Sequence, residues 1–239
     1  MSIADKTILI TGASRGIGRA LIDEALRRGV KRVYAGTRGP LPHADPRVTA
    51  LQLDVTSAAD IRRAVASIGS LDILVNNAGI APYDDLTDPE VLERTFAVNL
   101  FGVLNVTRAF LPLLKRARGA VVNHLSMVAL AALPLIPAYS ISKAAALNLT
   151  QSLRALLAGD GVRVHGVLLG PVDTDMNRAF DIPKATTESA ARGIFDGLER
   201  GEEEIFPDPV SQAVADGWRN GAAKALERQF AAFVPGNAA

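Results

Sequence analysis

The stretch Lys6–Gly18, KTILITGASRGIG, decides the fold expected for this chain of 239 residues. Its first half, residues 6–11, is β-branched and apolar and stops at small residues, as a buried strand does. Gly12, Gly16 and Gly18 then open a segment whose apolar residues recur at helical spacing. This arrangement lets backbone amides face a phosphate, because glycine has no Cβ to block close approach. A glycine-rich turn without a ligand is the alternative.

The size of the chain and the distribution of its charges limit the kinds of partner. No internal repeat, low-complexity tract or convincing linker divides the sequence, so we expect a single domain over residues 1–239. The formal net charge of +1 comes from dispersed acidic and basic residues and leaves no footprint for nucleic acid or an anionic membrane. We therefore expect a small-molecule partner, with neither nucleic acid nor membrane.

The sequence also bears on compartment and on metal binding. Cysteine is absent, which excludes disulfides, thiolate metal sites and cysteine nucleophiles from this sequence. The longest apolar run, residues 127–138, contains two prolines and is too short to span a bilayer. Asp5 and Lys6 interrupt any signal-peptide pattern. These features favour a cytoplasmic protein, and no histidine or carboxylate cluster indicates a metal site.

Strands and helices are expected to alternate along the chain. Apolar runs predict further strands at residues 32–37, 48–53, 71–75, 120–125 and 162–169, with a possible short last strand at 204–206. Helical spacing predicts later helices at residues 57–68, 89–115, 139–158, 187–200 and 208–231. Pro112 should kink or end its helix, and Gly159 should close the helix before it. This alternation implies an α/β fold with a parallel sheet and right-handed crossovers.

The end of the second expected strand bears on cofactor choice. In dinucleotide-binding folds an acidic residue there binds the ribose 2′-hydroxyl of NAD, whereas arginine accommodates the 2′-phosphate of NADP. This strand ends at Gly36, Thr37 and Arg38 without an acid, and Arg15 in the glycine loop offers a second cation. These residues favour NADP over NAD. The alternative is that both arginines are solvated surface residues.

Tyr139 and Lys143 form a possible proton-transfer pair. On a helix, residues four apart lie on one face about one turn apart. A nearby cation stabilises a phenolate and lowers the pKa of the tyrosine, which is otherwise a poor acid or base at neutral pH. Such pairs also arise by chance on solvated helix faces. The spacing alone is therefore weak support for a catalytic role.

Four other polar residues have less specific readings. Ser126 follows the fifth expected strand, where its hydroxyl could hydrogen-bond the oxygen that Tyr139 protonates. Asn99 lies among apolar residues and needs a hydrogen-bond partner, so a structural amide is the simpler reading. His124 and His165 lie inside expected strands and are read as sheet residues rather than catalysts.

Five motifs, in order, resemble those of the classical short-chain dehydrogenase/reductase family. They are TGASRGIG at 11–18, Asp54 with Val55, NNAG at 76–79, Ser126, and Tyr139 with Lys143. The match runs from about residue 5 to Met176. The resemblance implies a Rossmann fold, a three-layer doubly wound parallel sheet of about seven strands with helices on both faces. It assigns the cofactor part to about residues 1–125 and the catalytic and substrate part to about 126–239.

The resemblance also implies roles for a catalytic tetrad, Asn99, Ser126, Tyr139 and Lys143. In that family the tyrosine is the acid or base, and the serine positions the substrate oxygen. The lysine lowers the pKa of the tyrosine and binds the nicotinamide ribose, and the asparagine holds a water in a proton relay.

A larger set of residues is expected to contact NADP(H). It comprises the glycine loop, the ends of the following strands and the loop after the sixth strand. These residues are Gly12, Ser14, Arg15, Gly16, Ile17, Gly18, Thr37, Arg38, Asp54, Val55, Asn77, Ala78, Gly79, Tyr139, Lys143, Gly170, Val172 and Thr174.

Two positions depart from the family pattern. Leu169 stands where the family usually has a proline before Gly170, and His124 stands where it typically has an apolar or small residue. The last sixty or so residues, which shape the substrate pocket in that family, match only loosely. Apolar residues near the expected site, Leu133, Leu135, Ile136, Met176 and Phe180, indicate a hydrophobic ketone or aldehyde, although they could equally be core residues.

The leading hypothesis is an NADP(H)-dependent oxidoreductase that moves a hydride between nicotinamide and a carbonyl or secondary alcohol carbon. A cofactor-sensing regulator without turnover is one alternative. A halohydrin dehalogenase is another, less favoured because Lys143 and the glycine loop are intact. The family resemblance further implies a homodimer or homotetramer.

Overall fold

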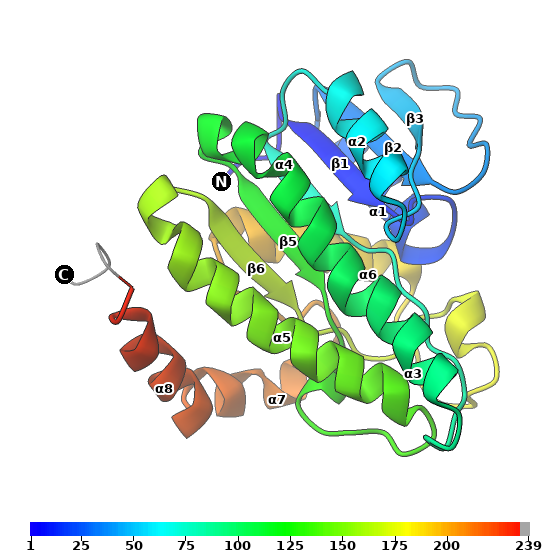
Figure 1. The fold of residues 1–239 in the computed structure, drawn as a ribbon, viewed down its shortest axis with the longest axis vertical. Helices are drawn as coiled ribbons and strands as arrows, with labels where there is room; N and C mark the ends of the chain where they lie inside the picture. Colours follow the sequence, from blue (N-terminus) through cyan, green and yellow to red (C-terminus); the bar gives the residue numbers. More distant parts are fainter. Residues whose placement is uncertain (235–239) are drawn as a thin grey trace.

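Seven parallel strands form one sheet in the computed structural model, which describes residues 1–234. Their order is β3-β2-β1-β4-β5-β6-β7 (Figure 1). The strands are β1 (Thr7–Thr11), β2 (Arg32–Thr37), β3 (Val48–Gln52), β4 (Ile73–Asn76), β5 (Ala120–His124), β6 (Arg163–Val167) and β7 (Glu204–Ile205). The strand order reverses between β1 and β4. In open α/β sheets a ligand crevice forms at that reversal, outside the carboxyl ends of the strands.

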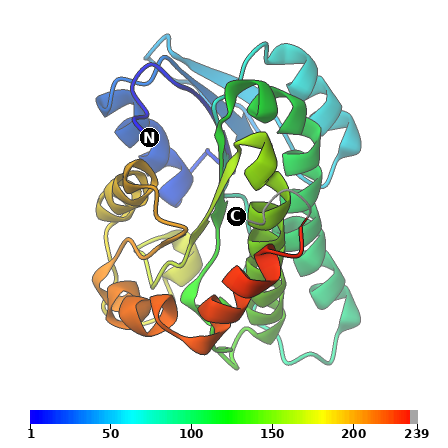
Figure 2. The ribbon, with the colours of Figure 1, turned by 90° about the vertical axis from the view of Figure 1, so that its left-hand side faces the viewer.

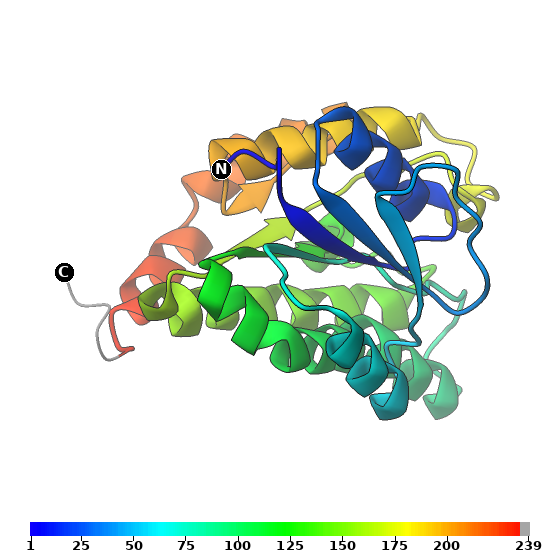
Figure 3. The same cartoon turned by 90° about the horizontal axis from the view of Figure 1, so that it is seen from above.

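Helices cover both faces of the sheet, as Figure 3 shows from above and Figure 2 from the side. One face carries α1 (Gly16–Arg27) and α6 (Thr187–Arg200), and the other carries α2 (Ala58–Ser67), α4 (Val103–Ala117) and α5 (Pro137–Leu157). The remaining helices are α3 (Pro89–Phe96), α7 (Pro209–Arg219) and α8 (Ala222–Ala231). The expected three-layer doubly wound fold is confirmed.

Consecutive strand residues pack into two separate hydrophobic cores, one on each face of the sheet. In β1, Ile8 and Ile10 pack toward α1 and α6, whereas Leu9 packs toward α2, α4 and α5. The same alternation places Val122 in the first core and Val121 in the second. A strand buried on both faces can therefore be apolar throughout, which explains why the sequence shows continuous apolar runs rather than alternation.

The segment predicted to be helical over residues 89–115 is helical from Pro89 to Ala117. The helix does not end at Pro112, which lies inside α4, and it continues to Ala117. Phe110 and Leu114 are completely buried, and this packing offsets the hydrogen bond that proline removes. The α-helical hydrogen bonding is instead interrupted at Ala97–Gly102, which form a π-helical stretch. Residues 89–117 are also long and apolar enough to cross a membrane, but the segment packs on the sheet as a core helix does.

Two other predicted boundaries are corrected. Helix α5 is followed by a short 3-10 turn, and the glycine in the left-handed region that closes it is Gly161 (φ +71°), not Gly159. The predicted helix over residues 208–231 is two helices, because Asn220 and Gly221 are not helical and separate α7 from α8. Residues 235–239 of the predicted domain lie outside the described part of the chain.

Candidate active site

The glycine loop between β1 and α1 has the backbone that close approach to a ligand requires. Gly12 and Gly16 have φ values of +65° and +53°, a region that side chains disfavour. A Cβ on Gly18 would overlap the Gly12 carbonyl oxygen and lie 2.7 Å from the side-chain Nδ2 of Asn77. Arg15, the N-cap residue of α1, forms no side-chain cap, so the first amides of the helix are available to an anion. The loop therefore fits a dinucleotide phosphate.

The turn after β4, Asn76–Gly79, is tied to the glycine loop by side-chain hydrogen bonds. Thr11 Oγ1 accepts from the backbone amides of Asn77 and Ala78 at 3.0 and 3.1 Å. The side-chain Nδ2 of Asn77 donates to the carbonyls of Thr11 and Gly12 at 2.9 and 3.1 Å. The two motifs thus form one rigid edge at the reversal of strand order. Thr11 is the first residue of the TGASRGIG motif, but its side-chain role was not predicted.

Tyr139 and Lys143 lie on one face of α5, as the spacing predicts. The Lys143 ammonium is 5.5 Å from the centroid of the Tyr139 ring. It donates a 2.6 Å hydrogen bond to the backbone carbonyl of His124, the last residue of β5. Ser126 caps the short helical turn after β5, and its hydroxyl lies close enough to the Tyr139 phenol to lower the pKa of that phenol. The predicted phenol, ammonium and serine hydroxyl are therefore brought together.

The protonation behaviour of the pair differs from the sequence expectation. Burial raises the pKa of Tyr139 to about 12, and the Ser126 hydrogen bond only partly opposes that shift. Burial also lowers the pKa of Lys143 to about 8. The expected lowering of the Tyr139 pKa is not found, because burial dominates the shift, and the Lys143 ammonium donates its hydrogen bond to the His124 carbonyl. The side-chain arrangement alone does not produce an acidic phenol.

Asn99 is completely buried within the π-helical stretch and has three hydrogen bonds. Its Oδ1 accepts from the Ile80 amide at 3.0 Å, and its Nδ2 donates to the Ile80 carbonyl at 2.9 Å. Nδ2 also donates to the Ser142 hydroxyl at 3.0 Å, beside Lys143. The side chain thus joins the loop after β4 to the helix that carries Tyr139, which agrees with the structural reading of this amide.

The loop after β6 is held without the proline that the family pattern expects. The Leu169 carbonyl accepts from the Met127 amide at 2.9 Å, next to Ser126. The Gly170 amide donates to Asp208 Oδ2 at 2.8 Å. Asp208 also caps α7 and is 2% exposed. A buried carboxylate therefore supplies the anchoring that a proline would otherwise provide.

Val172 and Thr174 lie further along the same loop. Val172 is completely buried and pairs with Ala185 in a parallel bridge. The Thr174 methyl group would lie 3.3 Å from a Cβ on Gly16. The loop after β6 and the glycine loop therefore face one another, as a shared cofactor site requires.

The remaining predicted cofactor residues border this edge with different degrees of exposure. The Arg15 side chain is 76% exposed and pairs with Asp175 at 3.2 Å, while Arg38 is exposed just after β2. Thr37 is buried at the end of β2. Asp54 accepts from the Thr56 amide and hydroxyl at 2.8 and 2.7 Å. Val55 packs against Gly102, while Ser14 is exposed and Ile17 is half-buried in the glycine loop.

Two residues that sequence reasoning missed border the entrance to the site. Tyr83, in the loop after β4, stacks against Phe180 in the loop after β6 with ring centroids 5.8 Å apart. Asp84 accepts a hydrogen bond from the Ala138 amide at 3.2 Å, directly before Tyr139. The only available signal was an aromatic and an acidic residue a few positions after NNAG.

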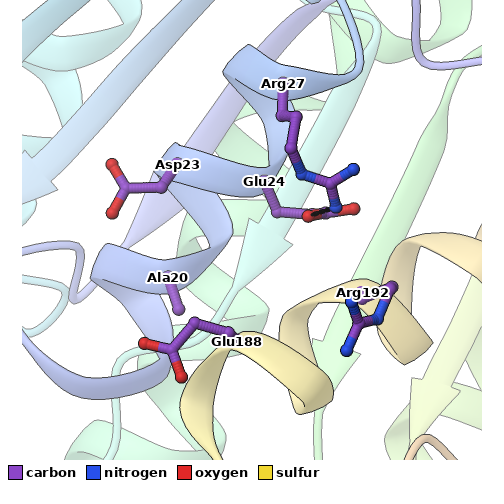
Figure 4. A pocket seen from close by; sticks show the side chains of 6 residues that line it. All are labelled: Ala20, Asp23, Glu24, Arg27, Glu188 and Arg192. Atoms are coloured by element: carbon purple, nitrogen blue, oxygen red, sulfur yellow. Dashed lines mark hydrogen bonds and ion pairs between the residues drawn. The ribbon is translucent and has the colours of Figure 1, made fainter.

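Two surface hollows adjoin α1. The first, shown in Figure 4, is lined by charged side chains of α1 and α6 and lies on the face of the sheet opposite to α5. Its lining includes the carboxylates of Asp23, Glu24 and Glu188 and the guanidinium groups of Arg27 and Arg192, and Arg27 pairs with Glu24. The second hollow reaches the glycine loop and is lined in part by Arg15, Gly16 and Thr174. Only the second adjoins the predicted cofactor residues.

Several known proteins are similar to this chain. The family model described as short chain dehydrogenase matches residues 6–184. Sorbitol dehydrogenase of Cereibacter sphaeroides is 35% identical over 207 residues, covering 81% of this chain and 80% of that protein. L-rhamnose 1-dehydrogenase (NAD(P)(+)) of Azotobacter vinelandii is 35% identical over 199 residues, covering 74% of this chain and 77% of that protein. A short chain dehydrogenase from Burkholderia cenocepacia J2315, solved in complex with NADP, is 38% identical, with a TM-score of 0.88 over 96% of this chain and 98% of that chain.

Proposed function

Because this chain belongs to the short-chain dehydrogenase family and is an oxidoreductase, we propose that it is an NADP(H)-dependent reductase of ketones or aldehydes with apolar substituents. The observation that carries this proposal is the convergence of Tyr139, Lys143 and Ser126 at the edge that also holds the glycine loop. Acid–base and positioning groups gathered beside a phosphate-binding loop suit a reaction between a dinucleotide and a small carbonyl.

The proposed mechanism assigns a separate task to each residue. The glycine loop, Asn77 and the loop at Val172 and Thr174 would hold the dinucleotide, which supplies the hydride when bound. Ser126 would donate a hydrogen bond to the substrate oxygen. Tyr139 would donate its proton to the same oxygen during reduction and recover it from solvent. Lys143 would bind the nicotinamide ribose, and Asn99 would hold α5 against the loop after β4.

The preference for NADP(H) rests on two cations and on the absence of an acid at the end of β2. Arg38 follows β2 and is exposed, so it can reach a 2′-phosphate. Arg15 is also exposed, although its pairing with Asp175 must loosen if it is to bind phosphate. The Burkholderia protein was solved with NADP, and the name of the Azotobacter relative allows either nucleotide. Both observations support the proposal.

The proposed substrate class rests on the residues at the entrance. Leu135, just before α5, and Met176, in the loop after β6, are 56% and 45% exposed, and Tyr83 contacts Phe180 in that same loop. Exposed apolar and aromatic side chains favour a carbonyl with apolar substituents. The name of the Cereibacter relative indicates a polyol, which is more polar. The proposal therefore predicts a different substrate for this chain.

A panel of carbonyl compounds, assayed with NADPH and NADH in parallel, tests the proposal directly. We expect NADPH to support faster turnover than NADH, and apolar ketones or aldehydes to exceed sugars. A preference for NADH would overturn the reading of Arg15 and Arg38. Turnover of polyols alone would overturn the substrate class, and binding of NADPH without any turnover would favour the cofactor-sensing alternative.

We also propose that the protein assembles as a homodimer or homotetramer. Phe101 beside α4 and Leu156 on α5 are 52% and 60% exposed, and a second copy could cover them. Light scattering on the purified protein tests this assembly. A monomer at micromolar concentration would contradict it.

A further inference from the structure

His124 lies at the carboxyl end of β5, on the face of the sheet that the glycine loop shares. Side chains alternate along a strand, and Ala120 and Val122 in the same register pack toward α1 and α6. The His124 side chain therefore lies on the α1 side. Its backbone carbonyl accepts the 2.6 Å hydrogen bond from Lys143. One residue thus adjoins both the predicted phosphate loop and the predicted catalytic lysine.

The hydrogen bonds of Asn77 determine which nitrogen of the His124 ring carries the proton. Asn77 Nδ2 faces the carbonyl oxygens of Thr11 and Gly12, so it must be the donor. Its Oδ1 therefore faces His124 Nδ1, at 2.8 Å. Because an amide oxygen only accepts hydrogen bonds, Nδ1 carries the hydrogen and Nε2 carries a lone pair.

The Nε2 lone pair has no partner among residues 1–234, but it is not enclosed. The imidazole nitrogens that are both buried and unpartnered in this part of the chain belong to His43 and His165. His124 is instead partly buried. Its acceptor atom is therefore not fully enclosed, and it lies at the carboxyl edge of the sheet.

We propose that His124 is a cofactor-positioning residue, whose Nε2 accepts a hydrogen bond from a hydroxyl or amide donor in the nicotinamide half of the cofactor. Lys143 and the turn at Asn77–Gly79 are the groups expected beside the nicotinamide ribose, and His124 contacts both Lys143 and Asn77. The ribose hydroxyls and the carboxamide are the donors in that half. This inference rests on the proposed function and adds a contact that an apolar residue at position 124 could not make.

Three substitutions separate the two ring nitrogens. In His124→Asn, the amide nitrogen can replace Nδ1 as donor to Asn77, but no atom reaches the Nε2 position. In His124→Gln, the longer amide can offer an acceptor near Nε2 without the bond to Asn77. His124→Leu removes both. His165→Asn, in β6, is the matched control, because His165 is buried beside Glu202 and away from the cleft.

Binding is measured by NADPH fluorescence and by titration with 2′,5′-ADP, which lacks the nicotinamide half, and folding by thermal unfolding. We expect His124→Asn to keep the unfolding midpoint and the 2′,5′-ADP affinity of the wild type while weakening NADPH binding by about threefold to tenfold, the range for one neutral hydrogen bond. His124→Gln should bind NADPH more tightly than His124→Leu. His165→Asn should lower the midpoint and leave both affinities unchanged.

The outcomes distinguish this inference from the proposed function. If His124→Asn binds NADPH as tightly as the wild type does, or loses 2′,5′-ADP affinity in parallel, the inference is wrong and the proposed function stands. If His124→Asn does not fold, the comparison of His124→Gln with His124→Leu replaces it. Equal NADPH affinities of these two variants would then overturn the inference. If the wild-type protein binds neither NADPH nor NADH, the proposed function fails first and the inference falls with it.

Discussion

The side-chain amide of Asn99 pairs with the backbone of Ile80, accepting from its N–H at 3.0 Å and donating to its carbonyl at 2.9 Å. The Asn99→Ala variant leaves both backbone groups without partners. An unsatisfied buried polar group costs about 1 to 3 kcal/mol, so we expect a loss of about 2 to 4 kcal/mol in the free energy of unfolding. Urea denaturation measures this. The control is Asn148→Ala, an exposed asparagine on α5, for which we expect almost no change. Equal effects of the two substitutions would contradict the structural role of Asn99.

Tyr139→Phe tests the proton donor. Phenylalanine keeps the ring that lies over Lys143 but removes the hydroxyl that Ser126 contacts. Positioned acid–base groups contribute about 10² to 10⁴ in rate, so kcat/KM for carbonyl reduction should fall by about that factor. The dissociation constant for NADPH should stay within about twofold, because removal of a proton donor does not remove the phosphate contacts. Tyr34→Phe, in β2, is the control and should leave turnover intact. Full turnover by Tyr139→Phe would exclude Tyr139 as the acid.

The parts of this site that sequence reasoning predicted are those set by local pattern. Strand runs, the glycine loop and the Tyr139–Lys143 spacing depend on neighbouring residues, and the structure confirms their placement. Contacts between distant segments left no such pattern. The Tyr83–Phe180 stack and the anchoring of Gly170 by Asp208 join residues far apart in the chain.

Sequence reasoning also failed where burial competes with a local rule. Of the two outcomes expected at Pro112, an end of the helix is wrong, because the surrounding apolar side chains are packed and α4 continues to Ala117. The direction of the pKa shift of Tyr139 depends on burial and on where the Lys143 ammonium points, and spacing reports neither. Such outcomes depend on the balance of tertiary interactions.

The pKa shifts of Lys143 and Tyr139 predict opposite changes of stability with pH. Burial lowers the pKa of Lys143 from 10.5 to about 8, so between these values the unfolded chain holds a proton that the folded chain has released. Stability therefore rises with pH across that interval. The pKa of Tyr139 is raised from 10.0 to about 12, so above pH 10 the folded chain holds the extra proton and stability falls.

Lys143→Met isolates the first of these changes. Relative to this variant, the wild-type protein without cofactor should gain about 2 kcal/mol in unfolding free energy from pH 7.5 to pH 10, at 1.36 kcal/mol for each pH unit over which only the unfolded chain holds the proton. The difference between the two proteins cancels the other titrating groups. Chemical denaturation at several pH values measures it, and parallel curves for the two proteins would show that Lys143 is not desolvated.

Gly18→Ala tests the close packing of the glycine loop. The new Cβ would overlap the Gly12 carbonyl oxygen and lie 2.7 Å from the side-chain Nδ2 of Asn77. We expect destabilisation of about 1 to 3 kcal/mol from overpacking and the loss of measurable NADPH binding. Gly217→Ala is the matched control, because Gly217 lies in α7 with no atom within 4 Å of the new Cβ. It should stabilise the protein by about 0.5 to 1 kcal/mol. NADPH binding that survives in Gly18→Ala would show that the loop is looser than the structure indicates.

The buried ammonium of Lys224 should hold α8 on the edge of the sheet. Lys224 is 1% exposed and contacts Glu203, Glu204 and Glu227 at 2.7, 2.9 and 2.9 Å. Replacing it by Met keeps the length of the side chain but leaves the carboxylates with Arg154 as their remaining cation in this cluster. Breaking such a pair from one side costs about 3 to 5 kcal/mol, because a charge stays buried without compensation.

We therefore expect Lys224→Met to expose α8 to proteases before the rest of the fold. Limited proteolysis with mass spectrometry locates the first cuts, and thermal unfolding reports the loss of stability. Lys31→Met serves as the control, since Lys31 is exposed just before β2. If Glu204→Gln in the Lys224→Met background restores stability, the uncompensated carboxylate is the cause. If it does not, the packing of the Lys224 stem matters more than its charge.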